Sequence, residues 1–347
     1  MSRKSRALKN ARLVVAEGAP SVSKVRGPAD VAVMVPYLLG FQPIESLVLV
    51  ALEGPRKRFG PVLRVDLVDD PCLQAEQAAL VVGVMTTNEV AHVLVAAFSD
   101  DAGRADPLVR LVLDGLAQHG VGLEDAFRAD GRRWWSYVCH DASCCSPDGV
   151  PYDAAASRVA AEAVLSGLSF VPDRESLRSR FAHDDPGTRT QVECSVASLR
   201  RDPSTHPRAA SAHLESRVAS VLGAPSALTP AETAWLALAV QSPAGQECAL
   251  RLIDRANAED HFEMWRIVMC RVADELLPPV GCLTAFSAWL DGRGVLASHA
   301  VDQVLEVAPG HPFARVIADL LAEAVNPRTW SDQLLRRDHD PSPPRAG

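Results

Sequence analysis

The feature that most constrains the fold is a change in hydrophobic periodicity partway along the 347-residue chain. Up to about residue 168, short runs rich in Val, Leu and Ala alternate with helical patterns. After about residue 207, the apolar residues repeat at helical spacing throughout. Alternating strands and helices favour a mixed sheet with flanking helices, whereas consecutive helices with short connections favour a bundle. We therefore predict an α/β N-terminal half and an all-α C-terminal half, built as a helical bundle or a stack of helical hairpins.

The length of the chain indicates two domains, because a single hydrophobic core rarely serves so many residues. Composition suggests ends that differ from the body of the chain: the start is basic and the end is charged and rich in Pro. We predict a disordered basic tail over 1–23, an α/β domain over 24–182, an irregular connector over 183–207, an all-helical domain over 208–335 and a disordered tail over 336–347.

Periodicity and turn residues predict the individual elements. In the first half they predict a helix ending at Leu39, a hairpin of strands 46–53 and 61–68, a helix over 74–86, a strand over 91–98, a helix over 107–119, a strand pair 123–128 and 133–138, and a helix over 153–168. In the second half, Thr229 and Glu232 are spaced as a capping box, with Pro230 at the first helical position. This pattern predicts a helix start.

Charge and composition exclude several functional classes. The net charge of −8 argues against a nucleic-acid partner, since such proteins are usually basic over the binding surface. The apolar runs are too short to cross a bilayer, and no signal peptide is visible, so we expect a cytoplasmic protein without a membrane partner. In that compartment the eight Cys stay reduced.

Cofactor motifs are missing. No Lys follows Lys57, which excludes a P-loop or Schiff-base lysine in most of the chain. Gly292-Arg293-Gly294 imitates a dinucleotide fingerprint, but it lies between two predicted helices with no strand before it. We interpret it as a turn. The sequence therefore indicates no nucleotide cofactor.

Two charges alternate on an otherwise apolar predicted strand. Arg64 and Asp66 project from one face, where they need partners or a polar cleft. They are candidates for binding an anionic substrate and for a general base, respectively. A structural salt bridge is the alternative, and we favour it.

The segment 134–152 concentrates rare residue types and begins within the predicted strand 133–138. On that strand Arg133, Trp135 and Tyr137 share one face, which makes them candidate ligand-binding residues together with Arg64 and Asp66. We expect the loop after the strand to lie at the edge where α/β proteins place their sites.

Three interpretations compete for the thiols of this loop. Cys139, His140, Cys144 and Cys145 offer enough ligands for tetrahedral zinc, although their spacing differs from that of common structural sites. Alternatively, Cys139 is a reactive thiol activated by a neighbouring Arg or His. In the third interpretation these are small buried residues that pack a crowded loop. We favour the third, since Cys is among the most often buried residue types.

Two stretches of the chain carry distinctive residue combinations. The first is Pro28-Ala29-Asp30 with Val35-Pro36-Tyr37-Leu38-Leu39-Gly40-Phe41, Pro43, Ser46-Leu47-Val48 and Arg64-Val65-Asp66-Leu67. The second is Gly131-Arg132-Arg133-Trp134-Trp135-Ser136-Tyr137-Val138-Cys139 with Cys144-Cys145, Pro147, Gly149 and Pro151. Together they resemble the domain of unknown function 4192 family of actinobacteria. An extra Arg before the paired Trp departs from the family pattern. The resemblance covers about residues 25 to 335. It implies an actinobacterial, cytoplasmic origin and supplies no reaction.

Two functional hypotheses follow. In the first, the protein is a non-catalytic binding or regulatory module whose α/β half senses a small ligand and whose helical half binds a protein partner. In the second, it is an enzyme for a small anionic substrate, with a pocket between the Arg64/Asp66 strand and the Cys139–Cys145 loop. We favour the first, because the sequence contains no recognised catalytic constellation.

Overall fold

The computed structural model describes residues 12–15, 25–166, 168–201, 211–323 and 325–327. Its contacts divide the chain into two compact units. The first unit runs to Leu177 and takes in Ala322–Val325, and the second begins at Arg178. The boundary thus lies five residues before the predicted one at 182. The predicted fold class is confirmed, since the first unit is α/β and the second is helical.

A seven-stranded mixed sheet forms the centre of the first unit, in the order β1-β3-β2-β4-β5-β6-β7. Its strands are Arg12–Val15 (β1), Ser46–Glu53 (β2), Arg58–Asp66 (β3), His92–Phe98 (β4), Gly122–Ala129 (β5), Arg133–Ser136 (β6) and Val150–Pro151 (β7). Only the β4–β5 pair is parallel. Strands β3, β4 and β5 therefore run in the same direction, and their carboxyl ends share one edge of the sheet.

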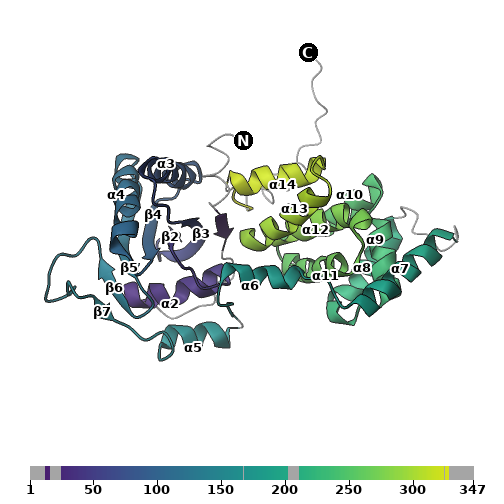
Figure 1. The fold of residues 1–347 in the computed structure, drawn as a ribbon, viewed down its shortest axis with the longest axis horizontal. Helices are drawn as coiled ribbons and strands as arrows, with labels where there is room; N and C mark the ends of the chain where they lie inside the picture. Colours follow the sequence, from purple (N-terminus) through teal and green to yellow (C-terminus); the bar gives the residue numbers. More distant parts are fainter. Residues whose placement is uncertain (1–11, 16–24, 167, 202–210, 324, 328–347) are drawn as a thin grey trace, which may run out of the picture. The chain divides into compact units, whose positions relative to one another are not determined.

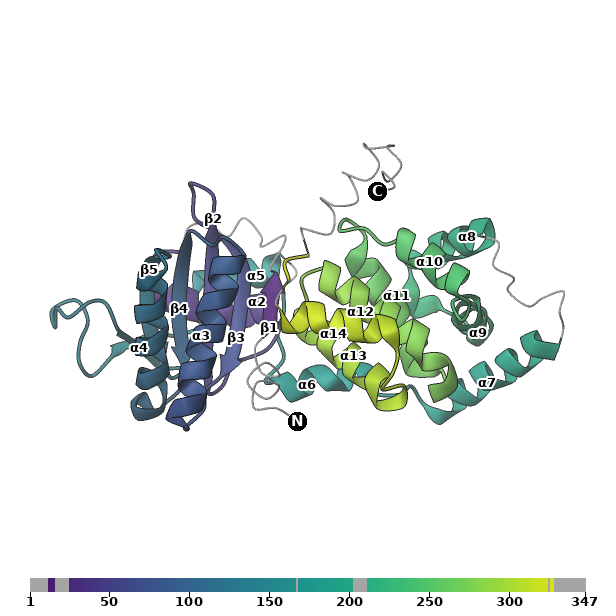
Figure 2. The ribbon, with the colours of Figure 1, turned by 90° about the horizontal axis from the view of Figure 1, so that it is seen from above.

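Helices cover both faces of this sheet. Helices α3 (Pro71–Thr87) and α4 (Ala102–Gln118) lie on one face, and α2 (Pro28–Leu39) and α5 (Arg158–Leu165) lie on the other (Figures 1 and 2). The boundary at Leu177 falls within a short helix, α6 (Arg174–Arg178).

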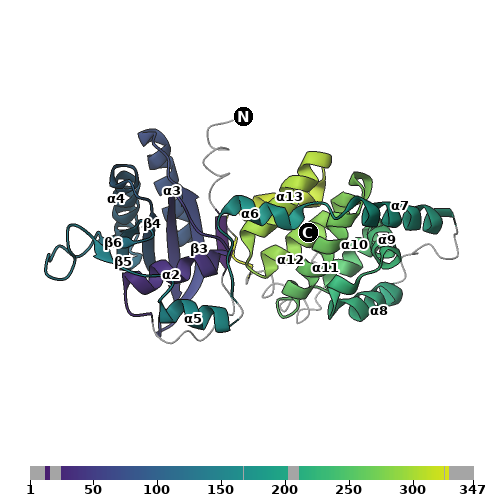
Figure 3. The same ribbon diagram turned by 60° about the horizontal axis from the view of Figure 1, so that its bottom comes forward.

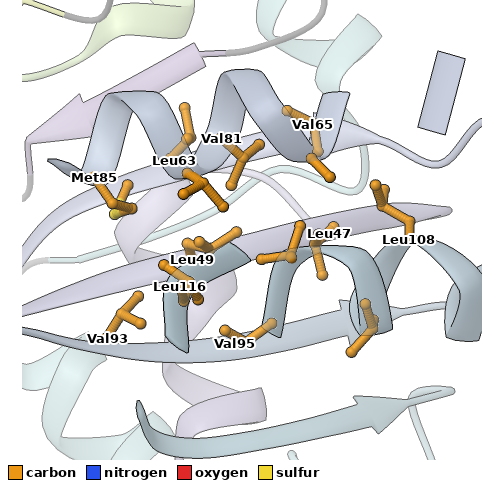
Figure 4. Close-up of a cluster of buried hydrophobic side chains, with 14 of the residues drawn as sticks. Leu47, Leu49, Leu63, Val65, Val81, Met85, Val93, Val95, Leu108 and Leu116 are labelled. Carbon is orange, nitrogen blue, oxygen red and sulfur yellow. The ribbon is translucent and has the colours of Figure 1, made fainter. Parts of the chain in front are cut away.

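The main core of the unit lies between the sheet and α3 and α4. Because successive side chains of a strand point to opposite faces, alternate residues of β2, β3 and β4 enter this core. Figure 4 shows it with Leu47, Leu49, Leu63, Val65, Val81, Met85, Val93, Val95, Leu108 and Leu116 labelled. The other residues of the same strands pack toward α2, so the central strands are apolar on both faces.

Local sequence signals fix ends of helices α2, α3 and α4. Asp70 and Asp101 accept backbone N–H groups at the starts of α3 and α4, at 2.8 Å from Cys72 N and 2.8 Å from Gly103 N. Helix α2 ends at Gly40, whose φ of 78° is the left-handed conformation that favours glycine. The loop from Phe41 to Glu45 then leads into β2.

The second unit is a set of packed helices (Figure 3). They are α7 (Pro186–Arg201), α8 (Ser211–Leu222), α9 (Pro230–Ala239), α10 (Pro243–Arg251), α11 (Ala258–Arg271), α12 (Leu277–Leu290), α13 (Gly294–Val307) and α14 (Pro312–Ala322). Helix α12 is buried along nearly its whole length and packs against α11 and α13. The capping box predicted at the start of α9 is confirmed, because Thr229 and Glu232 exchange side chain–backbone hydrogen bonds. The turn predicted at Gly292 is also confirmed, between α12 and α13.

Two predicted irregular segments contain regular structure. Arg12–Val15, placed in a disordered tail, forms strand β1 against β3. Pro186–Arg201, placed in the connector over 183–207, forms helix α7, which packs on α9. The predicted tail over 336–347 lies outside the described residues. Within the described part of the chain, no helix has the length and apolar character needed to cross a membrane.

His261 on α11 makes the helical unit sensitive to acid. The side chain is 1% exposed, and burial lowers its pKa to about 4, although Leu252, Asp254 and Asp260 favour the charged ring. Between pH 6.5 and about 4, His261 is protonated in the unfolded chain but stays neutral in the folded one. The free energy of unfolding therefore decreases as the pH falls. From pH 6.5 to 5 the expected loss from this residue is about 2 kcal/mol.

His261→Gln should remove this loss. Urea midpoints at the two pH values should therefore differ less in the variant than in the parent protein, whatever the stability of the variant at neutral pH. An equal pH dependence in both proteins would contradict the assignment.

Candidate functional site

A cavity of about 650 Å³ lies where β4 and β5 end, beside α2. Open α/β sheets usually bind ligands outside the carboxyl ends of their strands. The lining residues come from α2, the loop before β2, the ends of β4 and β5, and the segment after β7. They are Ala32, Val33, Pro36, Tyr37, Gln42, Pro43, Ile44, Glu45, Phe98, Ser99, Asp100, Ala129, Asp130, Gly131, Tyr152, Ala154, Ala155, Ala160 and Phe170.

Glu45 is fixed at one wall of this cavity. Its φ of 43° places a non-glycine residue in the left-handed region, which is uncommon and is often found at functional sites. Its carboxylate accepts a hydrogen bond from Ser99 Oγ at 2.8 Å and pairs with Arg104 Nη1 at 3.0 Å. Because Arg104 balances its charge and Ser99 occupies its other oxygen, Glu45 is a rigid, neutralised part of the wall.

A tight turn after β5 forms a second wall. Asp130 Oδ1 accepts the backbone N–H groups of Arg132 and Arg133 at 2.7 and 2.6 Å, which fixes the turn at Gly131. Tyr152 follows β7 and is held by its N–H, which donates to Arg132 O at 2.9 Å. Burial, followed by the charge of Asp130, raises the pKa of Tyr152 to about 12. Its hydroxyl is therefore protonated at neutral pH.

The cavity combines aromatic surface with negative charge. The Tyr37 and Phe170 rings meet edge to face with centroids 4.8 Å apart. Ile44 and Phe170 are 60% and 39% exposed, so apolar surface is open at the rim. Because Arg104 neutralises Glu45, the negative charge of the lining comes from Asp100 and Asp130, and none of the described lining residues is Lys, Arg or His. This chemistry suits a ligand with an apolar body and a positive charge.

Arg64 and Asp66 form an ion pair at the end of β3, outside this lining. Arg64 is 5% exposed, and its Nε and Nη2 donate to Ser46 Oγ at 2.9 and 2.7 Å. Burial lowers the pKa of Arg64, while the charge of Asp66 acts in the opposite direction. The guanidinium is thus held inside the fold by its neighbours, as the salt-bridge interpretation expects.

Arg133 and Trp135 of β6, and Tyr137 directly after it, also have internal partners. Arg133 Nη1 donates to Asp148 O and Gly149 O at 3.1 and 2.9 Å. Trp135 Nε1 donates to Pro147 O at 3.2 Å, and Tyr137 donates from its hydroxyl to Asp106 Oδ1 at 2.7 Å. Burial, with the bond to Asp106 next, raises the pKa of Tyr137. These contacts tie β6 to α4 and to the β6–β7 loop, and none of the three residues lines the cavity.

The cysteines of that loop are not packed in a core, which corrects the interpretation we favoured. Cys144 is exposed, and Cys139 and Cys145 are half-buried. Their three sulfur atoms lie within 4.8 Å of one another, whereas the exposed His140 is outside the group. The N–H of Asp141 lowers the pKa of Cys139, and partial burial raises the pKa of Cys145 to about 12.

The structure does not bring the Arg64/Asp66 pair and the cysteine loop together. Strands β2, β4 and β5 separate β3 from β6, a span of about 19 Å at ordinary strand spacing. In addition, β6 is antiparallel to β5, so the loop after β6 leaves from the opposite edge to the one where β4 and β5 end. The predicted pocket between Arg64 and Cys139 is therefore not formed.

Sequence reasoning missed the residues that line the cavity. Ser99 and Asp100 follow β4, and Asp130 and Gly131 follow β5. Both strands were predicted, but the pair 123–128 and 133–138 was interpreted only as a hairpin. Recognising that α4 links β4 to a parallel β5 would have placed these polar residues at one edge.

Comparison with known proteins identifies a family for this chain but assigns it no activity. The family model described as a domain of unknown function (DUF4192) matches residues 28–328. No curated protein and no solved structure matches the chain.

Proposed function

Since this chain belongs to the DUF4192 family of domains of unknown function, we propose a function from its own residues. We propose that the α/β unit is a non-catalytic binding module for a small organic cation, held in the cavity where β4 and β5 end. The observation that carries the proposal is a cavity of about 650 Å³ with aromatic and acidic walls and no basic residue among its described lining.

The lining favours binding over catalysis. Ser99 donates to Glu45, whose carboxylate is already paired with Arg104. No His lies among the described lining residues to take the proton of a nucleophile. By contrast, aromatic faces and carboxylates together recognise ammonium groups, whose charge attracts both. The same walls disfavour the anionic substrate expected for an enzyme.

A matched pair of compounds tests the choice of ligand. Phenethylamine and 3-phenylpropionate have similar apolar bodies and opposite charges. We expect the amine to raise the melting temperature of the full-length protein and the carboxylate to leave it unchanged. An amine at a hundred times its Kd would stabilise the folded state by about 2.7 kcal/mol. Equal shifts with both compounds, or none with either, would reject the proposal.

Substitutions of lining residues test whether the ligand binds in this cavity. Ala155 is exposed and lines the cavity, so Ala155→Trp should fill it and abolish the amine effect without disturbing the core. Asp100→Asn should weaken amine binding up to about fivefold, the range for one exposed charge pair. Asp114→Asn is the control, since Asp114 is an exposed carboxylate on α4 outside the lining. It should bind the amine like the parent protein.

We also propose that the protein is located in the cytoplasm. Exposed thiols such as Cys72, Cys144 and Cys194 suit a reducing compartment, which supports this location. The binding of a protein partner by the helical unit stays a prediction.

A further inference from the structure

Three thiols converge at the tip of the β6–β7 loop, away from the cavity described above. The Cys144 and Cys145 sulfur atoms are 3.9 Å apart, and the Cys139 sulfur lies within 4.8 Å of both. All three are free thiols, and none is fully buried. Apolar packing therefore does not explain their convergence.

The backbone of the loop is organised to hold this arrangement. Ser136 Oγ accepts the N–H of Cys139 at 2.9 Å, where β6 ends. Asp141 O then accepts the N–H groups of Cys144 and Cys145 at 3.0 and 2.7 Å, which closes a turn and places both residues beside Cys139. The Asp141 carboxylate is occupied by Ser143 at 2.9 and 2.7 Å. The hydrogen bonds that hold this turn therefore involve no cysteine side chain.

The returning strand anchors the same loop to the sheet. Gly149 has a φ of +82°, and a Cβ there would lie 2.6 Å from the Trp135 ring. Trp135 also donates to Pro147 O, and the Arg128 guanidinium stacks over it at 3.8 Å. The loop is therefore tied down on both sides of the cysteines.

The spacing of the sulfur atoms fits a tetrahedral metal ion. A Zn–S bond of about 2.3 Å places two thiolates on one ion about 3.8 Å apart. The Cys144–Cys145 distance of 3.9 Å already matches this edge, and Cys139 needs to move by about 1 Å at most. The Asp141 N–H that donates to Cys139 is the kind of outer partner that orients a thiolate ligand.

We propose that Cys139, Cys144 and Cys145 bind one thiophilic divalent ion, of the class of Zn²⁺, through three thiolates. The fourth position is left to water or an external ligand, because His140 lies outside the group and the site is open to solvent. Thiolate ligands select zinc and other soft ions over Mg²⁺ and Ca²⁺, which prefer oxygen.

Titration of the reduced full-length protein with Co²⁺ and then Zn²⁺ tests the site. We expect one equivalent of Co²⁺ to produce a thiolate-to-cobalt charge-transfer absorption, and one equivalent of Zn²⁺ to abolish it. Metal analysis after dialysis against Zn²⁺ should give one equivalent. Less than one equivalent, or a cobalt spectrum without thiolate bands, would overturn the proposal.

Single substitutions identify the ligands. Cys139→Ser, Cys144→Ser and Cys145→Ser should each weaken Zn²⁺ binding at least about tenfold, since each removes one of three ligands. The matched control is Cys194→Ser, an exposed thiol on α7, which should bind like the parent protein. His140→Ala should also bind like the parent within about threefold. Loss of binding in either of these two variants would contradict a site made of three thiolates. Because the loop is exposed, unchanged melting of the metal-free variants separates lost binding from lost folding.

Discussion

Gly245→Ala is expected to destabilise the helical unit by about 3 kcal/mol or more, although Ala normally stabilises a helix relative to Gly. A Cβ at this position would lie 1.9 Å from Ala239 O, a backbone atom at the end of α9. Gly245 lies in the first turn of α10, where its N–H donates to Ser242 Oγ at 3.1 Å. Moving the backbone away would break this cap and separate α10 from α9. Urea unfolding with hydrogen exchange of helical-unit peptides measures the loss.

Gly83→Ala is the matched control for this substitution. Gly83 is an exposed glycine in the middle of α3, and a Cβ there would meet nothing within 4 Å. Here the ordinary helix preference should hold, and Ala should stabilise the first unit by about 1 kcal/mol. If both substitutions stabilised the protein, the close approach of α9 and α10 would be wrong.

Elements whose burial is visible in their own residues could be predicted. Strands β2 and β4 read as unbroken apolar runs because the structure buries both of their faces, and their predicted ranges agree with the observed ones to within a residue. The capping box at Thr229 is similarly local, since a cap is formed by residues within one turn.

Elements that depend on a partner distant in the sequence could not be predicted. Strand β1 has only four residues, and its pairing with β3 defines it as a strand. Helix α7 is polar over most of its length and buries only Val192 and Val196, one turn apart. Such a short apolar pattern is hidden among Pro, Asp and Arg. It becomes a helix because α9 covers that stripe.

The candidate sites show the same limit. The cavity is lined from segments that are far apart in the sequence, so no motif marks it. The cysteine group was visible as a cluster of rare residues, but its exposure was not, because Cys is usually buried. Only the turn at Asp141 reveals that three of the four predicted ligands converge and that His140 does not.

Substitutions at the Arg64–Asp66 pair test whether its charges stabilise the fold or serve to bind a ligand. Arg64 is 5% exposed, whereas the Asp66 side chain is 35% exposed. Asp66→Asn would leave a buried guanidinium without its counter-ion. Breaking a buried pair in this way costs about 3 to 5 kcal/mol, and the partial exposure of Asp66 sets our expectation at the lower end, about 3 kcal/mol. Arg64→Met removes the buried charge, keeps most of the apolar stem and should cost less.

The order of these effects is the test. We expect Asp66→Asn to lower the free energy of unfolding more than Arg64→Met does, and adding Arg64→Met to Asp66→Asn to restore part of the loss. Glu124→Gln is the control, since the Lys57–Glu124 pair is exposed at 43% and 38% and should contribute less than about 1 kcal/mol. Urea unfolding of the four variants measures all of these terms. If Asp66→Asn cost no more than Glu124→Gln, Arg64 would not need its counter-ion for folding, and the pair would again be a candidate for recognition of a ligand.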